Sequence, residues 1–211
     1  MLISVPPKSK TDLVLELFKA GVIKFGQFNL KFNDKNSKAL PSPVYLDFGA
    51  LLSSPEVMQE IISWVWLKII KENMTFDFLS DVPTGSTPIV SVLSINHRIP
   101  MISPKISQAH GLTGEIKGIY SKGQRVVIID DVLTKGTSIK EIALILRKNG
   151  LIVENAIVAI DREQGGKQAL EEAGINCSSL LGFPKMLEIL LSYNKISQEK
   201  YREIITYLKA N

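Results

Sequence analysis

The sequence has few of the residues that support disulfide or zinc chemistry, and it has no long apolar run. Among its 211 residues are one cysteine, Cys177, and two histidines. A single thiol excludes intrachain disulfides and cysteine-based metal clusters. A membrane span needs about 20 apolar residues, whereas the most apolar stretch, Val57 to Ile70, is interrupted by charged and amide side chains. We expect this stretch to be an amphipathic packing helix, with Trp64 and Trp66 in the core.

Targeting signals and the common nucleotide-binding motifs are also missing. Residues 1–10 lack a charged start, an apolar run and a small-residue cleavage site, so we predict a cytoplasmic location. Neither G-x-x-x-x-G-K-[ST] nor G-x-G-x-x-G occurs, which argues against ATP and dinucleotide binding at such loops. The net charge of +4 is spread along the chain. It suits small anions at least as well as nucleic acid, and no separate helix-turn-helix module precedes the core, so neither nucleic acid nor membrane is an expected partner.

The chain does contain an alternation of short apolar strands and helical patterns from Thr75 onward. This alternation predicts an α/β fold with a mostly parallel sheet flanked by helices. The expected strands are 76–79, 99–102, 125–129, 152–160 and 176–181, and the expected helices are 87–97, 137–148 and 167–173. Ligands of open α/β sheets bind beyond the carboxyl ends of the strands. The loops after Leu79, Ile102, Ile129 and Ile160 are therefore the candidate site.

The segments on either side of this core predict a small hood and a cap. Residues 1–74 hold two helical patterns around a polar insertion, Phe32 to Pro41, which we expect to be an exposed hairpin or loop. Residues 184–211 carry two further helices, the second opened by Ser197 as N-cap. We therefore divide the chain into an N-terminal hood segment (1–74), an α/β core (75–183) and a helical cap (184–211), all within one integrated domain.

The strongest chemical signal lies between Val126 and Glu141, where a buried strand leads through an acidic pair and a small-residue turn into a helix. Gly136 permits a tight turn, which leaves the amides of residues 134–138 at a helix N-terminus. Unpaired N–H groups and the helix dipole favour a phosphate there. The hydroxyls of Thr137 and Ser138 add further donors.

The acidic pair, Asp130 and Asp131, is expected at the end of that strand, close to the phosphate. Carboxylates there can accept hydrogen bonds from sugar hydroxyls or hold Mg²⁺. Phosphate site and acidic pair together predict a ribose 5-phosphate ligand. In the alternative interpretation Thr137 is only a helix N-cap and the aspartates are solvated, which accounts for each feature alone but not for their conjunction.

This segment resembles the phosphoribosyl-pyrophosphate (PRPP) motif of type I phosphoribosyltransferases, whose pattern is a hydrophobic strand, two acids and T-x-G-[TS]. The resemblance implies the fold of that family and Mg²⁺ bound with PRPP. It also implies catalytic roles for Asp130 and Asp131 at the ribose hydroxyls. Around the 5-phosphate it places Val132, Leu133, Thr134, Lys135, Gly136, Thr137 and Ser138.

A second segment, Asp161 to Lys167, follows the next predicted strand and points to the acceptor. The planar guanidinium of Arg162 can bind a carboxylate bidentately, which suits an acidic base such as orotate, although Arg162 alone could be a surface ion-pair partner. The segment is similar to the D-R-x-E-x-G stretch of orotate phosphoribosyltransferases, with Gln164 at the position of the glutamate. That similarity implies contact between Arg162 and orotate.

Two earlier segments resemble the same family. Residues 25–31 match its F-G-x-F-x-L-K pattern, and residues 42–47 match S-P-x-Y/F-x-[DN]. The resemblance implies that Lys31 lies over the phosphates and that Tyr45 and Leu46 lie beside the base. It extends from Gly21 to about Leu181.

Two loops depart from the family's pattern. In the family a mobile R-K-x-x-K-x-H-G loop closes over the diphosphate of a neighbouring subunit, which implies a homodimer and catalytic roles for Lys105 and His110. Here Pro104 and Gln108 replace two of its cations. Residues 82–88 resemble the diphosphate-binding segment, with Thr84 where a lysine is common.

The predicted reaction is Mg²⁺-dependent transfer of the phosphoribosyl group from PRPP to N1 of orotate in pyrimidine synthesis, giving orotidine 5′-monophosphate and pyrophosphate. The alternative is a weak or silent homologue that binds PRPP or a nucleotide as a regulatory or partner subunit. Pro104, Gln108 and Thr84 motivate it. A third hypothesis, transfer to another base, would make Arg162 irrelevant to the acceptor.

Overall fold

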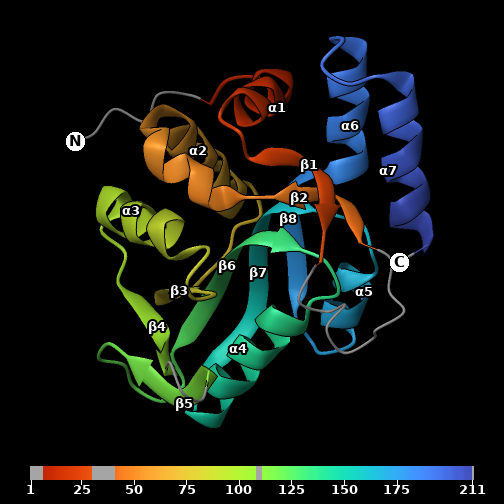
Figure 1. Cartoon of the computed structure of the whole chain (residues 1–211). Coiled ribbons are helices and arrows are strands. Elements are labelled where there is room, and N and C mark those ends of the chain that lie inside the picture. The colour runs from red at the N-terminus through yellow and green to blue at the C-terminus, as the bar shows by residue number, and fades with distance from the viewer. Residues whose placement is uncertain (1–6, 30–40, 108–110, 211) are drawn as a thin grey trace.

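The core of the protein is a six-stranded sheet with strand order β5-β4-β3-β6-β7-β8 (Figure 1). The computed structural model describes residues 7–29, 41–107 and 111–210. The strands are β3 (Phe78–Asp81), β4 (Met101–Ser107), β5 (Gly111–Lys117), β6 (Arg125–Leu133), β7 (Ile152–Asp161) and β8 (Asn176–Gly182). Only β5 runs antiparallel to its neighbour. The predicted mostly parallel sheet is confirmed.

Helices cover both faces of this sheet. One face packs against α4 (Thr137–Lys148) and α5 (Gly166–Glu171). The other contributes to a larger core formed with α1 (Lys10–Lys19), α2 (Pro55–Lys71), α3 (Thr87–His97), α6 (Phe183–Ser192) and α7 (Gln198–Ala210). Along β6, Val126 and Ile128 belong to the first core, and Val127 and Ile129 to the second. Because both faces are covered, the strand is a continuous apolar run rather than an alternating one.

A two-stranded antiparallel hairpin, which we call the hood, lies apart from the main sheet. It pairs β1 (Ile23–Phe28) with β2 (Ser42–Leu46) and is followed by a 3-10 turn, η1 (Phe48–Ser53). The sequence patterns predicted two helices and a polar insertion in this part of the chain, so neither β1 nor β2 was predicted. β1 has a mixed burial pattern, which leaves no two-residue periodicity to detect. The predicted loop at residues 32–41 lies, except for Pro41, outside the described residues.

Several strands extend past the ends predicted for them. β6 continues to Leu133, because its parallel pairing with β7 persists as far as Leu133 opposite Asp161. The acidic pair therefore lies inside the strand and not at its end. β4 continues to Ser107 and pairs antiparallel with β5, so the described part of the loop predicted after Ile102 is largely strand. The helices predicted at 87–97 and 137–148 match α3 and α4.

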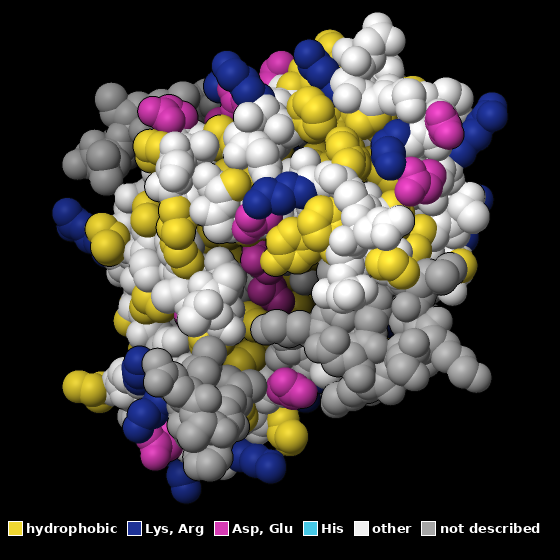
Figure 2. Space-filling model, in the orientation of Figure 1, with side chains coloured by type: hydrophobic (Ala, Val, Ile, Leu, Met, Phe, Trp, Pro, Cys, Tyr) yellow, Lys and Arg dark blue, Asp and Glu magenta, His cyan; other side chains and the backbone are white. Residues whose placement is uncertain are grey.

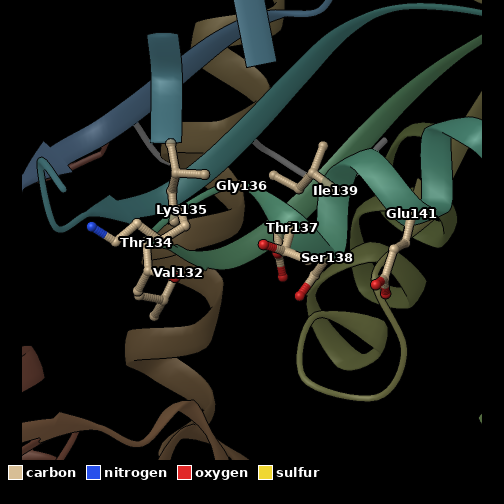
Figure 3. Close-up of a pocket in the computed structure, with 10 residues that line it drawn as sticks. Val132, Thr134, Lys135, Gly136, Thr137, Ser138, Ile139 and Glu141 are labelled. Carbon is tan, nitrogen blue, oxygen red and sulfur yellow. The ribbon is translucent and has the colours of Figure 1, made fainter. Parts of the chain in front are cut away.

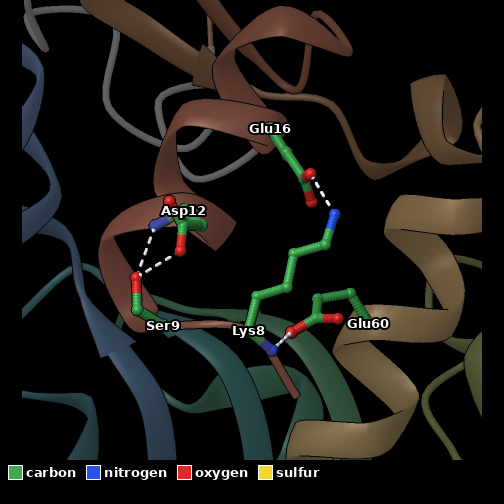
Figure 4. Close-up of polar contacts among 5 residues, drawn as sticks. All are labelled: Lys8, Ser9, Asp12, Glu16 and Glu60. Atoms are coloured by element: carbon green, nitrogen blue, oxygen red, sulfur yellow. Dashed lines mark hydrogen bonds and ion pairs between the residues drawn. The ribbon is translucent and has the colours of Figure 1, made fainter. Parts of the chain in front are cut away.

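The N-terminal helix is tied to its neighbours by polar contacts (Figure 4). The Ser9 hydroxyl caps α1, accepting a hydrogen bond from the Asp12 amide at 3.1 Å. The Lys8 backbone N–H donates to Glu60 on α2, and the Lys8 ammonium contacts Glu16. These contacts hold α1 against α2 at the edge of the larger core.

The remaining helices follow the predictions closely. Trp64 and Trp66 of α2 are half-buried against the larger core. Among the described helices, none is long and apolar enough to cross a membrane. α6 begins at Phe183, one residue before the predicted cap segment. Ser197 precedes α7, and its hydroxyl accepts from the Lys200 amide at 3.1 Å, which confirms the predicted N-cap.

Candidate active site

The predicted phosphate loop lies at the carboxyl end of β6 and lines a cavity of about 430 Å³ (Figure 3). The lining consists of Asp130, residues 132–139 and Glu141. Gly136 has a φ of 76° and is itself the N-cap of α4, whose first residue is Thr137. The interpretation of Thr137 as a mere N-cap is therefore wrong. The first amides of α4 open toward the cavity without a side-chain cap, as an anion site requires.

Polar side chains converge on one side of this helix start. The hydroxyls of Thr137 and Ser138 point the same way as the Glu141 carboxylate, while the Lys135 ammonium points away from them (Figure 3). Glu141 was not predicted, although it lies one helical turn after Thr137 and so on the same face. The negative charge of Glu141 disfavours a second phosphate beside it, so the anion site ends at this residue.

The two aspartates of β6 form a pair next to the cavity, in which Asp130 is buried and Asp131 is half-buried. Asp130 is 6% exposed and accepts a 2.9 Å hydrogen bond from the Asp131 amide, while the Asp131 carboxylate accepts one of 2.7 Å from the Val132 amide. Burial, with the negative charges of Asp131 and Asp81, raises the pKa of Asp130 well above its usual value. Burial also raises the pKa of Asp131. Hydroxyl donors or a cation brought by a ligand would offset this unfavourable charge.

A short loop between β3 and α3 completes this side of the site. Asp81, the fully buried last residue of β3, accepts a hydrogen bond from the Thr87 hydroxyl. The Ser86 hydroxyl accepts from the Val82 amide at 2.9 Å and donates to the Val82 carbonyl at 3.2 Å. These bonds close the loop on itself, which holds its backbone in one conformation.

This loop, predicted to bind diphosphate, lies directly against the acidic pair. A Cβ added to Gly85 would stand 2.7 Å from Oδ2 of Asp131. Thr84 is exposed on the same loop, and its expected place beside the diphosphate stays a prediction. The close approach requires a residue without a side chain at position 85.

The carboxylates fit Mg²⁺ only as an ion shared with the substrate. Among the described residues, no group of three or more His, Cys, Asp or Glu side chains is arranged to hold a metal. Asp130 and Asp131 nevertheless form a pair of carboxylates whose pKa values are raised by burial and, for Asp130, also by the neighbouring negative charges. Mg²⁺ usually binds to one or two carboxylates together with substrate phosphates, and the pair is suited to that mode.

Arg162 lies after β7 and is a buried cation without a carboxylate partner among the described residues. It is 2% exposed, and its Nη2 donates to the Ser42 hydroxyl of the hood at 3.3 Å. Its guanidinium carbon lies 5.9 Å from the centroid of the Phe183 ring, and its Nε has no hydrogen-bond partner. Burial lowers the pKa of Arg162, and a smaller effect of Tyr207 raises it. A buried guanidinium in this state is suited to an incoming anion.

The loop that carries Arg162 is fixed to the phosphate loop. The Arg162 amide donates to the Leu133 carbonyl at 2.9 Å. A Cβ on Gly166 would stand only 2.4 Å from the Thr134 carbonyl oxygen. Asp161 also accepts from the Glu163 amide at 2.8 Å. The two loops are thus packed backbone against backbone, which fixes the guanidinium relative to the cavity.

The hood reaches the candidate site through the hydrogen bond between Ser42 and Arg162. The Tyr45 side chain is 41% exposed, and its ring lies 5.5 Å from that of Phe28. Leu46 is 7% exposed and packs in the larger core, so its side chain faces the interior. Lys31 lies outside the described residues. Beneath the hood, Asp and Glu side chains gather in a hollow at the centre of the face shown in Figure 2.

Proteins of similar sequence include several named orotate phosphoribosyltransferase and others named uridine 5′-monophosphate synthase. No protein-family model matches the chain. Orotate phosphoribosyltransferase of Caenorhabditis elegans is 32% identical over 203 residues, which cover 96% of this chain and 87% of the relative. The protein of the same name from Pyrobaculum islandicum is 34% identical over 199 residues, covering 93% and 97% respectively. The chain belongs to the orotate phosphoribosyltransferase family.

The fold agrees with this assignment. The structure of Leishmania donovani UMP synthase superposes with a TM-score of 0.85 at 27% identity and covers 97% of this chain. The chain spans 43% of that longer protein. The resemblance drawn from the motifs, and with it the type I phosphoribosyltransferase fold, is confirmed.

Only part of the segment that resembles the family's mobile loop lies within the described residues. Lys105 lies in β4, where its ammonium pairs with Glu115 of β5 at 2.7 Å, and Pro104 beside it is buried. Gln108 and His110 lie outside the described residues. The catalytic roles expected for Lys105 and His110 stay predictions.

Besides Glu141, three polar residues beside the candidate site were not singled out from the sequence. Asp81 follows an apolar strand, which is the same signal that identified Asp130. Ser42 was noticed only as part of a motif, and its contact with Arg162 spans 120 positions. Gln164 was noticed only as a departure from the family's glutamate. It is 6% exposed, and neither polar atom of its side chain has a partner.

Proposed function

We propose that this protein transfers the phosphoribosyl group of PRPP to N1 of orotate, giving orotidine 5′-monophosphate and pyrophosphate in pyrimidine synthesis. The observation that carries the proposal is the buried Arg162, which lacks a carboxylate partner and is fixed beside a phosphate-binding loop. An acceptor with a carboxylate satisfies this guanidinium, whereas a neutral base leaves it uncompensated.

The phosphoribosyl group would be held by the segment that follows β6. The amides and hydroxyls around Thr137 and Ser138 would bind the 5-phosphate at the start of α4. Asp130 and Asp131 would accept hydrogen bonds from the ribose hydroxyls, which adds donors to the backbone amide that each carboxylate is bonded to in the free protein. Thr84 would lie beside the diphosphate. Fixing both substrates in one geometry removes much of the entropic part of the barrier.

The transition state is expected to be oxocarbenium-like, with negative charge developing on the departing diphosphate. Mg²⁺, held with the diphosphate beside Asp130 and Asp131, would stabilise that charge. The protein's own cations for this task would be Lys31 over the phosphates, and Lys105 and His110 from the loop of a partner subunit. The active form would accordingly be a homodimer in the cytoplasm.

The alternative of a silent PRPP-binding subunit gains no support from the relatives, which are named as transferases and synthases. A site that only sensed PRPP would also have no use for a buried guanidinium beside the hood. Transfer to a different base is disfavoured for the same reason.

The test is an assay of the purified protein with PRPP, Mg²⁺ and orotate, following the loss of orotate absorbance, with calorimetric titration of each substrate alongside. We expect turnover in the wild type and none in Asp131→Asn. Binding of PRPP without any turnover would contradict the proposal and favour the regulatory subunit.

A further inference from the structure

Gln164 carries two of the buried polar atoms that lack a partner in this structure. Its side-chain oxygen Oε1 and nitrogen Nε2 are both buried, and neither has a hydrogen-bond partner. Arg162, two residues earlier in the same loop, leaves its Nε without a partner as well. Buried polar groups are almost always paired in native proteins. Three such atoms in one short loop therefore indicate a polar ligand.

The loop that carries Gln164 is anchored at both ends, which fixes the position of the Gln164 backbone relative to Arg162. Its start is fixed by the sheet and by the ion pair of 3.1 Å between Lys167 and Asp161. Its end is fixed where Gly166 meets the Thr134 carbonyl.

The missing partner must offer both an acceptor and a donor, because a carboxamide has an N–H₂ group and a carbonyl oxygen. It must also lie within reach of Arg162. The Cα atoms of residues 162 and 164 are at most about 7 Å apart, since two residues span no more than that. One pyrimidine ring is large enough to reach both side chains.

We propose that Gln164 is a further base-binding residue, whose carboxamide pairs with the N3–H and a neighbouring carbonyl of the acceptor while Arg162 binds its carboxylate. This inference rests on the proposed function. N1 is the atom that attacks the ribose, so it is not available for a lasting hydrogen bond. N3 is the other ring nitrogen that carries a proton, and a carbonyl oxygen flanks it on each side. A carboxamide complements that edge with two hydrogen bonds.

The pairing makes Gln164 a specificity residue. A base that lacks a proton on N3 would leave Oε1 of Gln164 buried and unpaired. Sites built around such a hydrogen bond reject analogues that lack it much more strongly than apolar pockets reject a missing methyl group. Arg162 selects for the carboxylate, and Gln164 selects for the opposite edge of the ring.

The experiment compares orotate with 3-methylorotate, in which a methyl group replaces the N3 proton, for the wild type and two variants. We expect the wild type to favour orotate in kcat/KM on the order of 100-fold. Gln164→Ala removes the hydrogen bonds and makes room for the methyl group, so the preference should fall to within about threefold. Gln164→Glu keeps an acceptor for N3–H and should retain most of the preference. PRPP affinity should be unchanged in both variants.

The matched control is Glu163→Gln, a similar change at the exposed neighbouring position, which should leave both the preference and the kcat/KM for orotate unaltered. A Gln164→Ala variant that keeps the wild-type preference would overturn the assignment of Gln164, while leaving orotate transfer intact. A wild-type protein that turns over no orotate would overturn the proposed function itself. Should Gln164→Ala fail to fold, loss of the preference in Gln164→Glu would still contradict the inference.

Discussion

The phosphate side and the base side of this site are built in opposite ways. The phosphate side comes from one continuous stretch, residues 130–141, and uses backbone amides at the start of α4. The proposed base side joins Ser42 of the hood, Arg162 and Gln164 after β7, and Phe183 of α6. The first exposes the hydroxyl-bearing residues Thr137 and Ser138 although Asp130 is buried, whereas the second buries polar atoms of Arg162 and Gln164 that have no partner among the described residues. The comparison indicates that affinity for phosphate is local, while selection of the base depends on tertiary packing.

Removing the buried charge of Arg162 should have the largest effect on activity, and it should affect orotate but not PRPP. Arg162→Met keeps an unbranched side chain but eliminates the guanidinium. We expect kcat/KM for orotate to fall on the order of 10²–10³-fold, with the PRPP dissociation constant unchanged. The two quantities can be measured by steady-state kinetics and by calorimetry. Because an uncompensated buried charge is removed, the melting temperature should not fall. Equal losses for both substrates would show that Arg162 acts on the whole site.

Gly166→Ala should disturb both sides together, because position 166 is where the two loops meet. The new Cβ would lie 2.4 Å from the Thr134 carbonyl oxygen and 2.7 Å from Cγ of Leu133. Relieving such overlap typically costs about 1–3 kcal/mol of stability. We expect weaker binding of both PRPP and orotate in calorimetry and a lower urea midpoint.

The neighbouring Gly165→Ala is the control for this prediction. Its Cβ would enter open space, so the change tests only the strain of a φ of 85°, about 1–2 kcal/mol. If Gly165→Ala weakened binding of the two substrates as much as Gly166→Ala does, backbone strain and not contact between the loops would explain the effect.

Thr137→Val should weaken the binding of PRPP without affecting orotate. The change removes one hydroxyl at the cavity and nearly preserves the shape of the side chain. We expect PRPP affinity to fall about tenfold, as for one hydrogen bond to a charged group, while orotate affinity of the free protein stays the same. Calorimetric titration of each substrate measures both. Ser138→Ala, one residue further along α4, provides a second hydroxyl for comparison.

His97, which lies outside both sides of the site, should have the smallest effect, and only on the pH dependence of stability. His97 at the end of α3 stacks on Trp66, with ring centroids 3.8 Å apart. Burial lowers the pKa of His97, so the folded state disfavours the protonated ring. Stability should be full above the unfolded pKa of about 6.5 and should decline as pH falls through it toward the folded value.

The measurement for His97 is its pKa by NMR, together with melting temperatures at several pH values. His97→Gln should remove this part of the pH dependence without changing orotate or PRPP affinity. A pKa for His97 above that of an exposed histidine would contradict the prediction.

The sequence predicted the phosphate side of the site better than the base side. Residues 132–138 were assigned to the phosphate because a strand, a Gly at position 136 and a helix start are all local features. The ends of the strands were less predictable. β6 continues to Leu133 because β7 pairs with it there, and β7 begins 19 positions beyond that residue in the chain. The roles expected for Lys31 and His110 stay predictions.

By itself, the sequence determined the α/β class, the phosphate loop and the family, because each depends on periodicity or on contiguous motifs. Only the tertiary structure decided which polar groups are buried without a partner. Arg162 looked equally like a surface ion-pair residue in the sequence, and Gln164 looked like a simple departure from a motif. Arg162 packs against Phe183 and the hood, segments distant in the chain, and the burial of Gln164 likewise appears only in the folded protein. Solvation is a property of the assembled fold, and it is solvation that makes these two residues a candidate base-binding site.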